Sequence, residues 1–211
     1  MTNKLRHIAV CGNIGSGKTT LTEKLAKHYG WHPLYESVDK NPYLQDFYED
    51  MTRWGFHLQV YFLNSRFRQI MEIQSSNLIT IQDRTIYEDA YIFAANLYKT
   101  GHINERDYAR YLEIFHSMID FISPPDLLIY LKADIPKLVA QIQKRGRLYE
   151  DAIRMDYLKN LNTSYETWIA NYQEGRLLVV DMNRLDFVER VEDFSFIVDK
   201  MEFELHNLFN F

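Results

Sequence analysis

Residues 12–19 read GNIGSGKT, and this short stretch decides the fold. An apolar run, HIAVC at 7–11, precedes it, and a helix-like run, TLTEKLA at 20–26, follows it. The stretch fits the pattern G-x-x-x-x-G-K-[ST], in which a glycine turn connects a strand to a helix. The glycines let backbone N–H groups point inward, and the positive end of the following helix favours bound phosphate. The sequence therefore predicts a site for the triphosphate of ATP or GTP.

The polar side chains of this loop have separate chemical tasks. Lys18 places a positive charge between the β- and γ-phosphates, and the Thr19 hydroxyl can ligate Mg²⁺. The predicted phosphate-binding residues are Gly12, Asn13, Ile14, Gly15, Ser16, Gly17, Lys18, Thr19 and Thr20. The loop predicts a nucleotide donor, whereas the acceptor must be inferred from the rest of the chain.

Composition narrows the class of protein. The 211 residues are 46% hydrophobic and 25% charged, which is typical of one globular domain. The net charge is −5 without a basic block, so we expect no nucleic-acid partner. No apolar run reaches the roughly 18 residues of a membrane span, and we expect no membrane partner. Cys11 is the only cysteine, and the first residues lack the apolar core of a signal peptide, so we expect a cytoplasmic protein.

Short apolar runs alternate with longer helical segments. Several runs are continuously apolar, as expected for parallel strands covered on both faces. The predicted strands are 7–11, 33–35, 78–82, 126–131 and 177–181. The predicted helices are 18–29, 43–50, 53–76, 87–99, 104–122, 135–144, 151–173 and 188–207. This order predicts one α/β domain over 1–211, with a doubly wound parallel sheet of about five strands flanked by helices.

Charged residues follow two of the predicted strands, where an open α/β sheet binds its ligands. Glu36 follows the second strand, and a carboxylate there can accept the proton of an attacking hydroxyl. Asp83 and Arg84 follow the third strand, where the acid can hold Mg²⁺ and the arginine can neutralise charge on the moving phosphoryl group. The alternatives are a solvated surface glutamate and a surface ion pair.

Arg145 and Arg147 flank a glycine at the end of a predicted helix, with Glu150 close behind. Arginines in such a position are typical of a lid over phosphates, which predicts a small lid around 141–151. The alternative is a solvated basic helix terminus.

The predicted helices 53–76 and 104–122 are long for this class. One apolar stripe consists of Phe62, Phe67, Ile70 and Met71, and the other of Tyr108, Tyr111, Leu112, Phe115 and Met118. We expect most of this surface to be core. Its excess also fits a dimer face, so a homodimer is a further expectation.

Five motifs in order resemble the deoxynucleoside kinase family, from the phosphate loop to about Trp168. They are GNIGSGKT, YESV, FYEDMTRWGFHLQVYFLNSRFR, DRTIYEDAYIFA and RGRLYE. The stretch YESVDKNPYLQDFY also resembles bacterial deoxyadenosine/deoxyguanosine kinases. The resemblance implies a P-loop kinase fold and ATP-dependent, Mg²⁺-assisted phosphorylation of the 5′-hydroxyl of a deoxynucleoside in nucleotide salvage.

The resemblance also implies roles at the reacting groups. Glu36 matches the general base for the 5′-hydroxyl, and Arg84 matches the arginine that contacts that hydroxyl and the phosphates. With Lys18, these residues form the expected catalytic set. Asp83 stands where the family usually has glutamate beside the magnesium, so Thr19 and Asp83 are the expected metal ligands.

Other matches concern the nucleoside and the lid. Tyr48 and Glu150 match the pair that holds the sugar 3′-hydroxyl, and Gln59 matches the amide that reads the base edge through two hydrogen bonds. Trp54 and Phe93 are expected to line the base pocket. Arg145 and Arg147 are assigned to the lid, in which Gln141 replaces a further arginine of some members.

Arg66 and Asp89 bear on the choice of base. Arg66 lies seven residues after Gln59 and so on the same helix face. Family members that accept purines or deoxycytidine carry an Arg–Asp pair at the matching places. The resemblance therefore implies a purine deoxynucleoside, with deoxyadenosine first and deoxyguanosine or deoxycytidine next. The alternative is a purely structural ion pair.

Two other functions stay open at this point. A nucleoside monophosphate kinase, such as a thymidylate kinase, needs cations at its acceptor site, and Glu36 argues against it. A nucleotide-dependent switch usually carries N-K-x-D, whereas the only Asn-Lys of this chain is followed by Leu5-Arg6.

Overall fold

The structure is a computed structural model, and it describes residues 5–36, 41–147, 150 and 153–209. The strands are β1 His7–Cys11, β2 His32–Leu34, β3 Thr80–Asp83, β4 Leu127–Lys132 and β5 Arg176–Asp181. They form one parallel sheet in the order β2-β3-β1-β4-β5. This confirms the predicted five-stranded doubly wound sheet.

The central strands are buried along their whole length, which explains their continuous apolar character. Every residue of β1 and β3 is buried, as are the first five of β4. β1 pairs with β3 on one side and β4 on the other, so the phosphate loop that follows it leaves the sheet at its centre. The edge strand β2 has only three residues.

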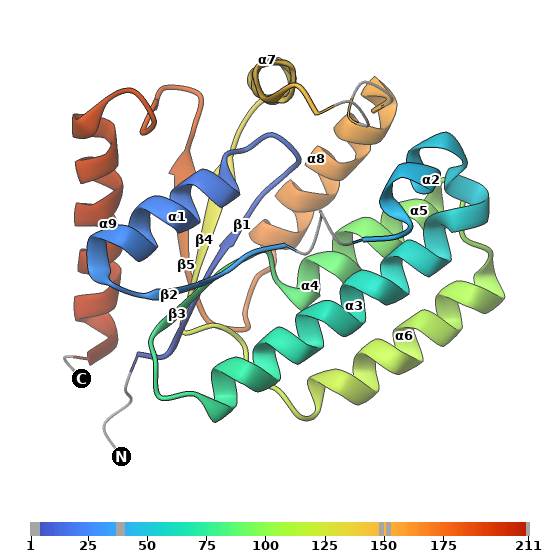
Figure 1. The fold of residues 1–211 in the computed structure, drawn as a ribbon, viewed down its shortest axis with the longest axis horizontal. Coiled ribbons are helices and arrows are strands. Elements are labelled where there is room, and N and C mark those ends of the chain that lie inside the picture. The colour runs from blue at the N-terminus through green and yellow to red at the C-terminus, as the bar shows by residue number, and fades with distance from the viewer. Residues whose placement is uncertain (1–4, 37–40, 148–149, 151–152, 210–211) are drawn as a thin grey trace.

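Helices cover both faces of the sheet (Figure 1). They are α1 Lys18–Tyr29, α2 Leu44–Glu49, α3 Met51–Ser75, α4 Ile86–Glu88, π-helix η1 Asp89–Ala94, α5 Ala95–Lys99, α6 Glu105–Ile119, α7 Ile135–Arg145, α8 Met155–Ala170 and α9 Val191–Phe209. Figure 1 shows α1 and α9 on one face, and α3, α4 and α8 on the other with α6 outside α3.

The helices differ from the predicted ones mainly at their ends. The helix predicted over 87–99 consists of three segments, because the backbone widens into the π-helix η1. α3 begins at Met51 rather than at 53, because the Asp50 side chain accepts a hydrogen bond from Arg53 N at 3.0 Å and caps it. α8 begins at Met155 rather than at 151, after an extended Arg154.

The two apolar stripes pack against each other. Ile70 of α3 and Tyr111 and Phe115 of α6 are buried in one cluster with residues of α4 and η1. Met71 is 43% exposed. Most of the striped surface is therefore core, as expected. Among the described residues, none of the helices has both the length and the apolar character that crossing a bilayer requires.

Candidate active site

The phosphate loop turns on three glycines with positive φ. Gly12, Gly15 and Gly17 have φ angles of 146°, 82° and 94°. A Cβ on Gly12 would lie 2.7 Å from Ser16 Oγ, and one on Gly15 would lie 2.7 Å from the carbonyl oxygen of Leu138. Both the backbone angle and the space therefore exclude a side chain. The loop has the strand before it and the helix after it that the sequence predicted.

Asn13 fixes the loop to a distant helix. Its Nδ2 donates to the Leu158 carbonyl oxygen and to Asn162 Oδ1 of α8, each at 3.1 Å, and its Oδ1 accepts from Ile14 N at 2.8 Å. Lys18 Nζ donates to the Asn13 carbonyl oxygen at 3.0 Å. Burial, reinforced by the nearby charge of Arg84, lowers the pKa of Lys18 to about 8.

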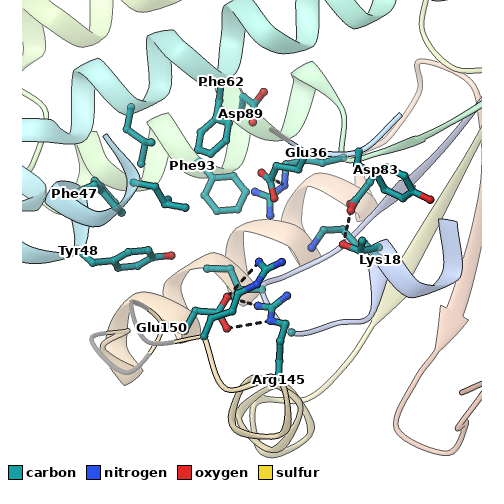
Figure 2. A pocket seen from close by; sticks show the side chains of 18 of the residues that line it. Lys18, Glu36, Phe47, Tyr48, Phe62, Asp83, Asp89, Phe93, Arg145 and Glu150 are labelled. Carbon is teal, nitrogen blue, oxygen red and sulfur yellow. Dashed lines mark hydrogen bonds and ion pairs between the residues drawn. The ribbon is translucent and has the colours of Figure 1, made fainter. Parts of the chain in front are cut away.

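A cavity of about 450 Å³ extends from the loop toward α2 and α3, and we name it the acceptor cavity. Figure 2 shows Phe47 and Tyr48 at one end, Lys18 and Asp83 at the other, and Glu36 and Phe93 between them. Ile14, Gly15, Lys18 and Thr19 bring the loop into its lining. The site therefore joins side chains that are more than a hundred positions apart in the chain.

Thr19 and Asp83 meet beside the loop. Thr19 Oγ1 donates to Asp83 Oδ2 at 2.6 Å, and Asp83 Oδ1 is buried without a hydrogen-bond partner among the described residues. Mg²⁺ prefers oxygen ligands and is usually held by one or two carboxylates together with water and phosphate oxygens. This donor pair fits that cation. Within the described part of the chain, no group of three or more His, Cys, Asp or Glu residues suits a metal.

Glu36 lies between two arginines. Its Oε1 is 3.1 Å from Arg66 Nη2 and 3.2 Å from Arg84 Nε. Burial raises the pKa of Glu36, but the positive charges of Arg84, Arg66 and Lys18 outweigh that effect and lower it below the usual value. The carboxylate is therefore ionised at neutral pH and able to accept a proton.

Arg84 combines a strained backbone with a stacked side chain. Its φ is 73°, the only positive φ among the described non-glycine residues, and such a conformation costs energy. Its N–H donates to the Val10 carbonyl oxygen at 2.9 Å, and its guanidinium lies 4.1 Å from the centre of the Phe93 ring. The turn therefore aims the cation into the acceptor cavity.

The inner part of the cavity suits a planar base. Gln59 is 2% exposed, and its Oε1 has no hydrogen-bond partner among the described residues. Phe62 and Phe93 supply apolar walls beside it. A buried amide oxygen without a partner is costly unless a ligand satisfies it.

Trp54 lies elsewhere. It is not among the residues that line the acceptor cavity. Its ring is 5.8 Å from that of Tyr43 and 5.5 Å from that of His57, under the guanidinium of Arg53. Its position on α3 is one turn before Leu58, which does line the cavity, so the contacts of its ring with Tyr43 and His57 rather than the helix face account for this placement.

Arg66 and Asp89 face each other at the side of the acceptor cavity, where Asp89 belongs to the lining and Arg66 does not. Arg66 Nε is 3.7 Å from Asp89 Oδ2, and neither atom has a hydrogen-bond partner among the described residues. Burial raises the pKa of Asp89 to about 7, although Arg66 and Arg84 oppose the shift. The predicted Arg66–Asp89 pair is therefore present. Arg66 is fully buried, and it also contacts Glu36.

The arginines predicted for the lid hold Glu150. Arg145 donates through Nε to Glu150 Oε2 at 3.0 Å and through Nη2 to Oε1, and Arg147 Nη1 is 3.8 Å from that oxygen. Tyr48 lines the same cavity as these three residues. Of the expected lid, Leu148, Tyr149 and Asp151 lie outside the described residues, as do Ser37 and Val38 of the YESV motif.

The other side of the loop lines a second cavity of about 50 Å³. Gly15, Ser16, Gly17, Thr20 and Gln141 contribute to it, together with residues 185–188. The loop therefore separates two spaces, a large one toward Glu36 and a small one toward α7. Gly12 and Asn13 are buried behind it.

Glu88 is a residue that the sequence analysis missed. It is fully buried, and its Oε1 accepts from Tyr165 Oη at 2.7 Å and from Gly12 N at 3.3 Å. Its Oε2 accepts from Thr85 N at 2.7 Å. The sequence T-x-x-E at 85–88 is a capping-box signature and could have predicted this last contact, but the other two depend on the fold.

Comparisons with known proteins agree with this geometry. A family model described as deoxynucleoside kinase matches residues 8–206. A deoxyadenosine/deoxycytidine kinase of Bacillus subtilis is 37% identical over 202 residues, which is 95% of this chain and 93% of that protein. A deoxyguanosine kinase of Lactobacillus johnsonii is 36% identical over 213 residues, covering 97% of this chain and 94% of that protein. The structure of deoxyadenosine kinase from M. mycoides with bound dATP matches with a TM-score of 0.82 and 30% identity, over 92% of this chain and 98% of that one.

Proposed function

This chain belongs to the deoxynucleoside kinase family and transfers phosphate to the 5′-hydroxyl of a deoxynucleoside, and we propose that deoxyadenosine is its best acceptor. One observation carries the assignment as a kinase of this kind. The acceptor cavity contains an ionised carboxylate, Glu36, between the phosphate loop and a pocket with a buried amide, Gln59.

In the proposed mechanism, Glu36 accepts the proton of the 5′-hydroxyl as that oxygen attacks the γ-phosphorus of ATP. Lys18 and Arg84 stabilise the negative charge that develops on the transferred group. Thr19 and Asp83 would hold Mg²⁺, which neutralises charge on the donor phosphates when it is bound. The products are a deoxynucleoside monophosphate and ADP.

The lid and the sugar site share one cluster. We propose that Arg145 and Arg147 bind donor phosphates as part of a small lid over 141–151 in a single domain. Their contacts with Glu150 support this assignment, because they bring the arginines to the acceptor cavity. Tyr48 and Glu150 would together hold the sugar 3′-hydroxyl, which would donate a hydrogen bond to the Glu150 carboxylate.

The choice of base rests on three polar groups. Gln59 can form two hydrogen bonds with a base edge, and the buried Arg66–Asp89 pair places Asp89 in the lining of the same cavity. Relatives named for deoxyadenosine, deoxycytidine and deoxyguanosine fit this assignment. Phe93 would pack on the base, and we expect deoxyguanosine or deoxycytidine to rank second.

A panel of the four deoxynucleosides with ATP and Mg²⁺, scored by kcat/KM, tests the proposal. Deoxyadenosine should have the highest value and thymidine the lowest. Deoxyadenosine monophosphate as acceptor, and a reaction without acceptor, are the controls for a monophosphate kinase and for a hydrolysing switch. A thymidine value equal to that for deoxyadenosine would contradict the assignment of Arg66 and Asp89.

We also propose a cytoplasmic homodimer. Its support is the exposed apolar surface near the packed stripes, including Met71 on α3 and Ile114 on α6, and a single buried thiol, Cys11, which suits a reducing compartment. Light scattering should give twice the chain mass of 25.3 kDa at micromolar concentration. A stable monomer would contradict the dimer and leave the kinase assignment unchanged.

A further inference from the structure

The carboxylate of Glu36 has little support from its own strand. β2 lies at the edge of the sheet and ends at Leu34, so Glu36 follows the last ladder position. Arg66 and Arg84 hold its Oε1 at 3.1 and 3.2 Å. The orientation of this group therefore depends on where the two guanidinium groups lie.

Arg66 has two acidic neighbours at unequal distances. Its Nη2 is 3.1 Å from Glu36 Oε1, whereas its Nε is 3.7 Å from Asp89 Oδ2. The longer contact exceeds normal hydrogen-bond length, and both of its atoms lack a hydrogen bond within the described residues. A small shift toward Asp89 would form that bond and weaken the contact with Glu36. The observed position therefore needs a third contact.

Gln69 supplies that contact from one turn further along α3. Its Oε1 accepts from Arg66 Nη1 at 3.2 Å. Its Nε2 donates to the carbonyl oxygen of Tyr35, the residue before Glu36, at 2.7 Å. The same Oε1 accepts from Gln82 Nε2 at 2.9 Å. An amide has one acceptor and one donor end, so only this orientation satisfies all three contacts.

The far end of this network is uncharged. His7 Nε2 is 3.0 Å from Gln82 Oε1, and both side chains are buried. Burial lowers the pKa of His7 to about 4, so its ring is neutral and donates to Gln82 at neutral pH. Titration of His7 therefore does not affect a pH profile above about pH 5, whereas Asp89, with a pKa of about 7, titrates within that range, and the Glu36→Gln variant separates its effect from that of Glu36.

Glu36 is surrounded by charged groups from several different elements. The positive charges that lower its pKa come from Arg84 after β3, Arg66 on α3, Lys18 on α1 and Arg147 after α7, and the negative charges of Glu36 and Asp89 on η1 act on each other. The acceptor cavity also contains Glu23, Asp83, Arg145 and Glu150. Gln69 adds no charge to this set, so its effect must come from position.

We propose that Gln69 is a positioning residue for the general base. It holds Arg66 on the Glu36 side of the Arg66–Asp89 pair and fixes the Tyr35 carbonyl, so that the Glu36 carboxylate points at the acceptor hydroxyl. This role rests on the proposed function of Glu36.

Two substitutions separate position from charge. Gln69→Met has similar length but lacks both ends of the amide, and we expect kcat with deoxyadenosine to fall about tenfold. The acid limb of kcat/KM should move to higher pH, because a looser Arg66 lowers the pKa of Glu36 less. KM for ATP should stay within about twofold, because the phosphate loop is unchanged.

Gln69→Glu keeps acceptor oxygens for Arg66 and Gln82, although it cannot donate to Tyr35. We expect most of the wild-type plateau rate at high pH, with the acid limb still shifted because the new negative charge offsets Arg66. Gln74→Met, at an exposed position of the same helix, is the matched control and should behave as wild type. Gln69→Glu decides the question alone if Gln69→Met does not fold.

Wild-type kcat and an unshifted acid limb in the Gln69 variants would overturn the inference. So would a loss confined to thermal stability or to KM for ATP. Glu36→Gln is assayed in parallel: near-normal turnover of that variant would refute the proposed base itself. A slow Glu36→Gln together with normal Gln69 variants would refute only the positioning role.

Discussion

The phosphate loop and the acceptor cavity are built in opposite ways. The loop is one contiguous stretch whose shape comes from glycine backbone angles and the start of α1. The cavity gathers charged side chains from separate elements, and its central carboxylate is held by other side chains rather than by its own strand. A backbone-built site tolerates little change in residue size, whereas a site built from side chains is sensitive to charge and to small shifts.

Removal of the carboxylate at the centre of the cavity should have the largest effect. We expect Glu36→Gln to lower kcat at least about 100-fold, the usual scale for a general base. KM for ATP should stay close to the wild-type value, because the loop does not depend on Glu36. Single-turnover rates with deoxyadenosine measure the chemical step, and near-normal rates would remove Glu36 from its role.

Addition of a methyl group to the phosphate loop tests whether its backbone shape excludes side chains. Gly15→Ala places a Cβ at a φ of 82° and 2.7 Å from the Leu138 carbonyl oxygen. We expect about tenfold weaker ATP binding and a loss of stability of about 2 kcal/mol, with deoxyadenosine binding unchanged. Calorimetric titration and thermal melting check both values.

The control for this change is Gly101→Ala. Gly101 has a similar φ of 78° but no heavy atom within 4 Å of the added Cβ. It should lose about 1 kcal/mol from backbone strain and retain normal ATP binding. Equal ATP affinity in both variants would show that the loop accommodates a side chain.

The pH dependence of ATP binding tests the phosphate loop separately from the acceptor cavity, because it depends on the charge of Lys18. Its pKa is lowered to about 8, mainly by burial, so the free protein loses this charge as pH rises through that value. We expect the dissociation constant for ATP to rise about fivefold between pH 7 and 9. Lys18→Arg should bind more weakly but without this pH dependence, because arginine stays charged. A flat wild-type profile would contradict the lowered pKa.

The smallest effect is expected at Trp54. Because its ring packs with Tyr43 and His57 outside the cavity lining, Trp54→Leu should change KM for deoxyadenosine less than about twofold. Phe93→Leu, within the lining, should raise it clearly more. Steady-state kinetics of the two variants compare them, and a larger effect at Trp54 would place the base nearer to the start of α3.

The sequence predicted the loop because its function lies in consecutive residues. The central strands β1, β3 and β4 were predictable because burial on both faces makes them mostly apolar, whereas the edge strands β2 and β5 are partly exposed. The functional residues after β2 and β3 were predictable because ligands bind at the carboxyl ends of parallel strands. The contact of Arg66 with Glu36 was not predictable, because residues 30 positions apart meet only through the packing of α3 on the sheet. The same holds for Glu88, whose partners Gly12 and Tyr165 lie 76 and 77 positions away.

The Asn13 amide has a consequence for cooperativity. It joins the loop to a helix 149 positions further along the chain, through hydrogen bonds to Asn162 and Leu158. We therefore expect the loop and α8 to open together in native-state hydrogen exchange. A nucleotide that stiffens the loop should therefore slow amide exchange in α8 as well. The exchange rate of a helix distant in sequence would then report whether the loop is occupied.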